Sequence, residues 1–336
     1  MKFFTHVISP SYGFELCHDD NVVLLGSCFA ELMGGRLAAN KFHVISNPTG
    51  VLYNPASIFK LLNTSLSWGN CTEDAVVSSW CFEHGGMWRS WLHDTSFSYD
   101  DREVLLSCVR ETLCALQSAL RLVDVIFLTF GTSHAYRLRS SGLIVSNCHK
   151  VEPSLFEEVC LSVEDIVTMG SEIIEHLVKL RPSVMVVLTI SPYRYAKYGF
   201  HGNQVSKATL LLAVETLVER YPDNIRYFPA YEIVCDELRD YRYYAEDMLH
   251  VSGVAAEYIW ERFVQDWLSE NSQRFIAEWH SVQKDLGHRP LNARSVEYRL
   301  FLQGVKRKIE CFAMRYPRIS FLEELSEVDR RLKQID

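Results

Sequence analysis

The chain of 336 residues contains 48% hydrophobic and 23% charged residues, the balance of a folded globular protein, which excludes a chain that is disordered throughout. Its net charge of −8 lacks the basic excess of a general nucleic-acid-binding protein, so we expect no nucleic-acid partner. The longest apolar runs are far shorter than the roughly 20 residues that a membrane-spanning helix needs, so we expect no membrane span.

The ten cysteines are expected to be reduced thiols. A chain of this length does not need disulfides to hold its core, and several cysteines lie in apolar or helical runs, among them Cys108, Cys114 and Cys160. The amino terminus is not followed by the apolar stretch and cleavage site of a secretory signal. Together these features predict a cytoplasmic location.

Five short apolar runs rich in Val, Ile and Leu are typical of strands that are buried on both faces. They cover residues 21–25, 42–46, 124–130, 184–190 and, more weakly, 225–228. Helical patterns lie between or beside them at residues 29–39, 102–122, 156–180 and 204–220. This alternation predicts an α/β fold in which helices cover both faces of a parallel sheet, a three-layer α/β/α arrangement.

Two regions depart from this alternation. Residues 76–82 and 87–92 flank a Gly-Gly pair and predict a β-hairpin insertion. After residue 265 the strands stop, and helices are predicted over 269–285, 291–315 and 321–333. We therefore expect an α/β domain over residues 1–265 and a helical C-terminal extension over residues 266–336.

The extension contains a basic stretch. Residues 284–318 hold nine Lys or Arg and three Asp or Glu. Such a stretch is typical of a solvated helical surface, and the alternative is a face that binds a partner or a phosphate group. The oligomeric state stays open, as does a role of these helices as a scaffold or oligomerisation element.

Polar side chains follow the predicted strands, where ligands bind in parallel sheets. The first strand leads into Gly26-Ser27-Cys28, and later strands lead into Gly131-Thr132-Ser133-His134 and Ser191-Pro192-Tyr193. Asp247 and His250 come late, just before a helix that starts near residue 252. Nucleophiles, a carboxylate and an imidazole at one edge predict acyl transfer through a covalent intermediate.

The turn after the first strand places Ser27 and Cys28 at the start of a predicted helix. Free backbone N–H groups at such a helix start stabilise negative charge. A hydroxyl or thiol there gains an oxyanion site, and a cysteine is expected to have a lowered pKa. Three residues separate Asp247 from His250, so the carboxylate can orient the ring while its other nitrogen takes a proton from the nucleophile.

Residues 25–31 (LGSCFAE) carry the pentapeptide that names the GSCFA family, and the chain resembles that bacterial family. Further matching segments follow in order at 47–55 (NPTGVLYNP), 130–132 (FGT), 147–150 (NCHK), 206–208 (SKA), 227–232 (YFPAYE) and Asp247-x-x-His250. The family looks like a branch of the SGNH, or GDSL-type, hydrolase superfamily. That resemblance implies a flavodoxin-like fold and ester-hydrolase or acyltransferase chemistry.

The resemblance also implies roles for single residues. The superfamily's first block is Gly-Asp-Ser, which aligned from Gly26 places the nucleophile at Cys28, and a one-residue slip would place it at Ser27. Chemistry favours Cys28, but both stay open. The oxyanion-hole glycine corresponds to Gly50. The third block, Gly-x-Asn, is here Gly131-Thr132-Ser133, so the asparagine donor is missing and a nearby hydroxyl or the His134 ring would replace it.

Asn147, His149, Lys150 and Lys207 have no counterpart in the superfamily blocks. Each either binds an anionic or acyl-carrying part of the substrate or has a structural role. No Cys-x-x-Cys pair, His-Glu-x-x-His helix or phosphate-binding glycine loop is present, so we expect no metal and no cofactor.

The sequence thus predicts an acyl-ester hydrolase or O-acyltransferase that acts on a small-molecule or glycan acyl ester. In it, Cys28 or Ser27 attacks, His250 serves as base and then acid, and Asp247 orients His250. The alternative is a non-catalytic module that binds a carbohydrate or acyl ligand in the same pocket, which the altered third block favours.

Overall fold

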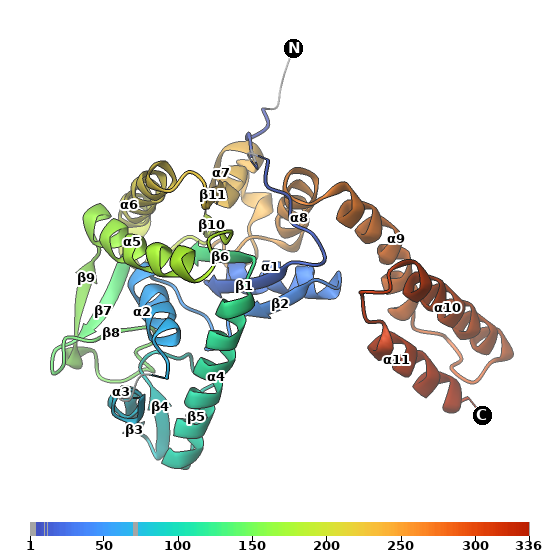
Figure 1. Ribbon diagram of the computed structural model, residues 1–336, viewed down its shortest axis with the longest axis horizontal. Coiled ribbons are helices and arrows are strands. Elements are labelled where there is room, and N and C mark those ends of the chain that lie inside the picture. The colour runs from blue at the N-terminus through green and yellow to red at the C-terminus, as the bar shows by residue number, and fades with distance from the viewer. Residues whose placement is uncertain (1–4, 10, 12, 70–72, 336) are drawn as a thin grey trace.

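A five-stranded parallel sheet forms the centre of the protein (Figure 1). A computed structural model describes residues 5–9, 11, 13–69 and 73–335. The strand order is β11-β10-β6-β1-β2. The bounds are Asn21–Gly26 for β1, His43–Ser46 for β2, Val125–Phe130 for β6, Met185–Ile190 for β10 and Ile225–Phe228 for β11.

Helices cover both faces of this sheet because alternate side chains of each strand point to opposite faces. In β1, Val23 and Leu25 join one core cluster and Val22 and Leu24 join the other. The first cluster includes helices α2 (Pro55–Leu66), α4 (Arg102–Leu122), α5 (Val163–Leu180) and α6 (Gly199–Arg220). The second includes α1 (Cys28–Ala39) and α8 (Gly253–Trp267). The expected α/β sheet with flanking helices is therefore confirmed.

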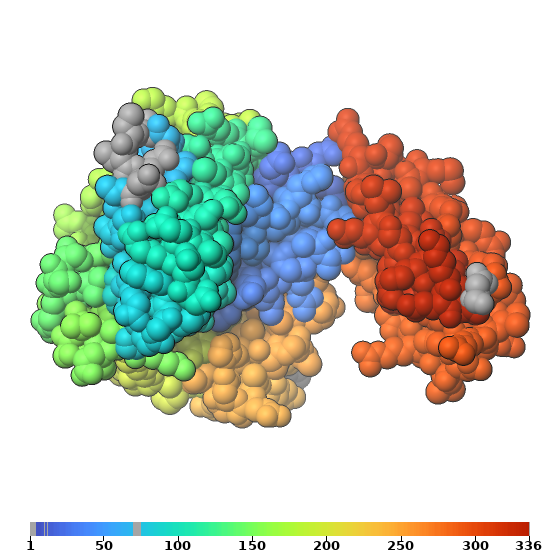
Figure 2. Space-filling view, turned by 90° about the horizontal axis from the view of Figure 1, so that it is seen from below, coloured from blue at the N-terminus to red at the C-terminus, as the bar shows by residue number. Residues whose placement is uncertain are grey.

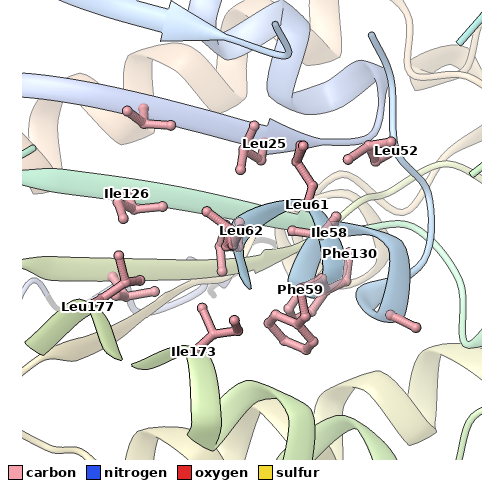
Figure 3. Close-up of a cluster of buried hydrophobic side chains, with 14 of the residues drawn as sticks. Leu25, Leu52, Ile58, Phe59, Leu61, Leu62, Ile126, Phe130, Ile173 and Leu177 are labelled. Carbon is pink, nitrogen blue, oxygen red and sulfur yellow. The ribbon is translucent and has the colours of Figure 1, made fainter. Parts of the chain in front are cut away.

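Helix α2 fills the middle of the first cluster. Figure 3 shows its Ile58, Phe59 and Leu62 between the sheet residues Leu25, Ile126 and Phe130 and the α5 residues Ile173 and Leu177. Asn54 begins the helix, because its side chain accepts a hydrogen bond from the Ser57 N–H at 2.8 Å and Pro55 follows it. This helix was not predicted from the sequence.

Two small antiparallel sheets lie outside the main sheet. One contains β3 (Cys81–His84), β4 (Met87–Ser90) and β5 (Ser98–Tyr99), which confirms a hairpin at Gly85-Gly86. Its first strand is shorter than expected, because residues 73–80 form helix α3 (Glu73–Trp80). The other contains β8 (Ile144–Val145), β7 (His134–Leu138) and β9 (Phe156–Cys160), in the order β8-β7-β9.

Strand β9 corrects the predicted helix over residues 156–180. Phe156–Cys160 pairs with β7, and a capping box of Ser162 and Asp165 starts α5 only at Val163.

Three C-terminal helices form a separate core: α9 (Glu270–Leu286), α10 (Val296–Arg315) and α11 (Leu322–Lys333). They lie beside the sheet domain in Figure 1 and form a distinct lobe in Figure 2. Contacts to the sheet domain include the Trp279 N–H donating to the Ala39 carbonyl at 3.2 Å and the ion pair of Lys41 with Glu324. The expected division at residue 265 stays a prediction.

Residues 1–4, part of the segment from which the absence of a signal sequence was predicted, lie outside the described residues, as does Cys71. The nine described cysteines form no disulfide. Within the described ranges, no helix is both long and apolar enough to cross a membrane.

Two adjacent glycines in α1 provide a matched test of how this helix packs on strand β2. A Cβ on Gly34 would lie 2.4 Å from the Ser46 Oγ of β2, whereas a Cβ on Gly35 would meet nothing within 4 Å. We expect Gly34→Ala to lower the free energy of unfolding by about 1–3 kcal/mol through overpacking. We expect Gly35→Ala to raise it by about 0.5–1 kcal/mol, because alanine favours the helix. Urea unfolding of both variants measures this, and equal effects would contradict the packing of α1 on β2.

Candidate active site

The first turn of the site follows β1 at the carboxyl edge of the sheet. Gly26 has a φ of +140°, and a Cβ there would lie 2.2 Å from the Thr129 carbonyl oxygen, so only glycine fits between β1 and β6. The Gly26 N–H donates to the Asn47 side-chain oxygen at 2.8 Å. These contacts tie the loop after β1 to β6 and to the loop after β2.

Ser27 and Cys28 differ in their access to solvent. Ser27 is fully buried and is the N-cap of α1, where its hydroxyl accepts a hydrogen bond from the Phe29 N–H at 3.3 Å. Cys28 is the first residue of the helix and is partly exposed. Of the two candidate nucleophiles, only Cys28 has a side chain that reaches the surface.

Burial raises the pKa of the Cys28 thiol, although the backbone N–H groups of Cys28 and Phe29 lower it. The nearby Glu31 carboxylate raises it further. The predicted lowered pKa is therefore wrong in direction, because desolvation outweighs the helix start. At neutral pH the side chain is a thiol, and it needs a base to become a nucleophile.

Asp247 and His250 form a hydrogen-bonded pair. The Asp247 Oδ2 lies 2.5 Å from the His250 Nδ1, and the other carboxylate oxygen accepts the N–H groups of Leu249 and His250 at 2.9 and 3.0 Å. The bonds from His250 and then from Leu249 lower the Asp247 pKa to about 2. Both side chains are exposed. The carboxylate is thus ionised at neutral pH and fixes the ring through Nδ1.

Two tyrosine side chains lie close to these groups. The Tyr193 ring lies 4.4 Å from the His250 ring, centroid to centroid. Burial, then the charge of Asp247 and then that of Cys28, raise the Tyr193 pKa, which places this ring within electrostatic range of both. The Tyr53 pKa is raised by burial and then by Cys28. Neither tyrosine was given a role from the sequence, although Tyr193 follows a strand end.

The polar groups of the predicted oxyanion residues form hydrogen bonds with other residues of the protein. The Gly50 N–H donates to the Asn47 carbonyl at 2.8 Å, and the Gly131 N–H donates to the Tyr53 carbonyl at 2.8 Å. The Thr132 N–H donates to the same Tyr53 carbonyl at 3.1 Å, and its hydroxyl pairs with Ser206 at 3.1 Å. The oxyanion role predicted for the Gly50 N–H is therefore replaced by closure of a turn.

Gly50 is nevertheless a position where only glycine fits. Its φ is +82°, and a Cβ would lie 2.0 Å from the Asp94 carboxyl carbon. The turn thus brings the Asp94 carboxylate against the backbone at the edge of the site.

Asn147, His149 and Lys150 belong to a different part of the molecule. His149 is buried, its Nε2 pairs with the Ser90 carbonyl at 2.8 Å, and burial lowers its pKa. The Asn147 side chain accepts the His149 N–H at 2.7 Å, and Lys150 is exposed with a φ of +59°. Among the described residues, no hydrogen bond or ion pair joins these three to Cys28, Asp247 or His250. Instead, His149 ties the loop after β8 to strand β4 of the hairpin.

Lys207 is fully buried under the carboxyl edge of the sheet. Its ammonium donates to the carbonyls of Gly131 and Ser191, each at 2.6 Å. It therefore ties the ends of β6 and β10 together, and it does not face an anionic ligand as its charge suggested. Burial lowers its pKa to about 7.

The described residues include no cluster of three or more His, Cys, Asp or Glu side chains that is suited to hold a metal ion.

No match was found among the curated proteins. A solved structure described as "a putative platelet activating factor from Streptococcus pneumonia" is similar at 12% sequence identity and a TM-score of 0.38, over 76% of this chain and 83% of that chain. That likeness is too distant to inform function.

Two family models match in sequence. The model of the GSCFA family matches residues 21–263, which include Cys28, Asp247 and His250. The model described as the C-terminal domain of the GSCFA domain protein matches residues 279–334. The chain belongs to the GSCFA family.

Proposed function

We propose that this protein is an acyl-ester hydrolase or O-acyltransferase that works through an acyl-thioester on Cys28. Numbered by position in the chain, the strands of its main sheet have the order 2-1-3-4-5, which is the order of flavodoxin-like doubly wound folds. This order supports an SGNH-like fold. The proposed substrate class is an acyl ester of a small molecule or glycan.

The Asp247–His250 pair carries the proposal. Its 2.5 Å contact fixes the imidazole through Nδ1, which leaves Nε2 as the nitrogen that can exchange a proton. Tyr193 contacts the His250 ring and is within electrostatic range of Cys28. An oriented imidazole and a partly exposed thiol on one sheet edge are the two parts that nucleophilic acyl transfer needs.

In the proposed reaction, His250 Nε2 takes the proton of the Cys28 thiol as the sulfur forms a bond to the ester carbonyl carbon. The carbon–oxygen bond of the ester then breaks, and the leaving alcohol receives the proton from His250. Water or an acceptor alcohol, deprotonated by the same nitrogen, attacks the thioester and releases the thiol. The raised pKa of the thiol makes this base necessary.

A second candidate is a non-catalytic module that binds a carbohydrate or acyl ligand. The engaged N–H groups of Gly50 and Gly131 favour it, because they leave fewer donors for an oxyanion. The exposed Tyr53 ring and the half-buried Tyr193 ring would provide stacking surfaces. This module would bind ligand without turnover.

Turnover of p-nitrophenyl acyl esters by the full chain tests the proposal, together with the Asp247→Asn variant. We expect this variant to lower kcat by about tenfold to a hundredfold, because the amide is a weaker acceptor for the His250 ring than the charged carboxylate. The loss should not be larger, because water partly screens the exposed Asp247–His250 pair. Asp240→Asn is the matched control, because Asp240 is also exposed and caps a nearby turn. Absence of turnover in the wild type, with ligand binding intact, would favour the binding module instead.

A further inference from the structure

A hollow of about 780 Å³ lies between the loop that joins α9 to α10 and helix α11. Arg289 and Arg294 line it from the loop, and Arg330 and Arg331 line it from α11. Its volume is within the range of small-molecule sites. The hollow is far along the chain from Cys28, and it belongs to the C-terminal helices that the proposed chemistry does not use.

The carboxylate of Glu327 also lines the hollow, and two of the arginines neutralise it. Both oxygens of Glu327 accept bonds from Arg330 at 2.8 Å, and one also accepts the Arg331 Nε–H at 2.6 Å. Arg331 donates further to the Leu286 carbonyl at 2.7 Å. These bonds hold both guanidinium groups in place, so a ligand would meet charges that are already oriented.

Arg289 and Arg294 complete the hollow without a charged partner. Both are exposed, and their guanidinium groups form no ion pair or hydrogen bond with another described residue. The backbone around them is ordered, since the Arg294 N–H donates to the Asn292 side chain at 3.0 Å and Ser295 caps α10. Four guanidinium groups therefore face one carboxylate, an excess of positive charge that an anion would stabilise.

The C-terminal helices are also more positively charged than the rest of the chain. Residues 269–336 carry thirteen Lys or Arg and ten Asp or Glu, a net charge of +3. Residues 1–268 therefore carry a net charge of −11, which brings the net charge of the whole chain to −8. The field of the molecule thus directs anions toward the C-terminal helices and away from the sheet domain.

We propose that this hollow, formed by Arg289, Arg294, Arg330 and Arg331, binds a multiply charged oxyanion of the phosphate class. Guanidinium groups pair with phosphate oxygens through two parallel hydrogen bonds, which a set of converging arginines provides. Because a loop forms one side of the hollow and helix α11 forms the other, an anion bound in it would contact arginines from both. This proposal takes up one of the two alternatives for the basic stretch, a face that binds a phosphate group, and adds two arginines of α11 to it.

Inorganic pyrophosphate is the test ligand, titrated calorimetrically into the full chain at constant ionic strength. We expect one pyrophosphate to bind per chain, and the Arg289→Gln/Arg294→Gln double variant to weaken binding by about tenfold or more, since charge-assisted bonds are lost. Both side chains are exposed and form no ion pair or hydrogen bond with another described residue, so the variant is expected to stay folded, which circular dichroism checks. The Lys284→Gln/Arg307→Gln variant removes the same charge from exposed positions outside the hollow and should change affinity by less than about twofold.

Three results would overturn the proposal. One is the absence of pyrophosphate binding by the wild type. Another is equal weakening in both double variants, which would mean general charge attraction without a site. The third is preferential binding of a single-stranded oligonucleotide over pyrophosphate, which would indicate a nucleic-acid surface. None of these depends on acyl turnover, so they are independent of the function proposed for Cys28.

Discussion

Replacing Cys28 with alanine is expected to abolish acyl transfer, with kcat lower by roughly 10⁴-fold or more, because the variant lacks the atom that carries the acyl group. Loss of a nucleophile leaves only binding and electrostatic contributions to catalysis. The measurement is steady-state turnover of a p-nitrophenyl ester, together with mass spectrometry of the acylated peptide. The acyl group should be found on Cys28 in the wild type and on no residue in the variant.

Ser27→Ala is the matched control at the neighbouring position. Its hydroxyl caps α1, so we expect the free energy of unfolding to fall by about 1 kcal/mol while turnover stays within a fewfold of the wild type. The opposite result, with activity lost in Ser27→Ala and kept in Cys28→Ala, would reject Cys28 as the nucleophile. Because burial raises the Cys28 pKa above the ordinary value of 9.0, alkylation of this thiol should keep accelerating as the pH rises beyond 9.

The Lys207→Met variant is expected to change how stability depends on pH. Burial lowers the pKa of Lys207 to about 7 from a model-compound value of 10.5. Between these two values the unfolded chain holds a proton that the folded chain releases, so the wild type gains stability as pH rises. From pH 7 to pH 9 this gain is about 2 kcal/mol, and Lys207→Met should lack it.

Urea unfolding of both proteins across this pH range measures the difference. Lys179→Met removes an exposed lysine and is the control, whose curve should run parallel to that of the wild type. Parallel curves for Lys207→Met and the wild type would contradict the lowered pKa. Methionine also leaves the carbonyls of Gly131 and Ser191 without their donor, so we expect Lys207→Met to be less stable than the wild type at pH 9.

Local signals in the sequence were sufficient for the sheet and its first turn. The apolar run of β1 ends at Gly26, and helix α1 begins two residues later, as the sequence analysis expected. Runs that are apolar at both odd and even positions require burial on both faces, which only a sheet between two helix layers provides. This pattern is local, so it predicts a buried strand even when the helices that cover the strand are not known.

Non-local pairing decided the segments that the sequence analysis assigned incorrectly. Phe156–Cys160 continues a helical pattern in the sequence, yet its backbone pairs with β7, whose residues lie 18 to 26 positions earlier in the chain. The hairpin was expected to start at residue 76, but α3 extends to Trp80, whose side chain is buried in the main core. In both cases tertiary packing outweighs local propensity.

The candidate site shows the same division. Spacing was enough to pair Asp247 with His250, because three residues separate them and the turn between them is local. Spacing could not choose between Ser27 and Cys28, since that choice depends on which side chain the surrounding core buries. It also could not show that the Gly50 N–H closes a turn or that Lys207 lies beneath the sheet edge.

The length, composition and charge of this chain by themselves determined its class, a folded acidic protein, and the apolar periodicity determined its α/β sheet. Tertiary structure alone decided the environment of each reactive group, because burial and hydrogen bonding depend on residues that are distant in sequence. It raised the Cys28 pKa where the helix start alone predicts a lower one. It also gathered the arginines of two separate segments around one hollow in a chain whose net charge is −8.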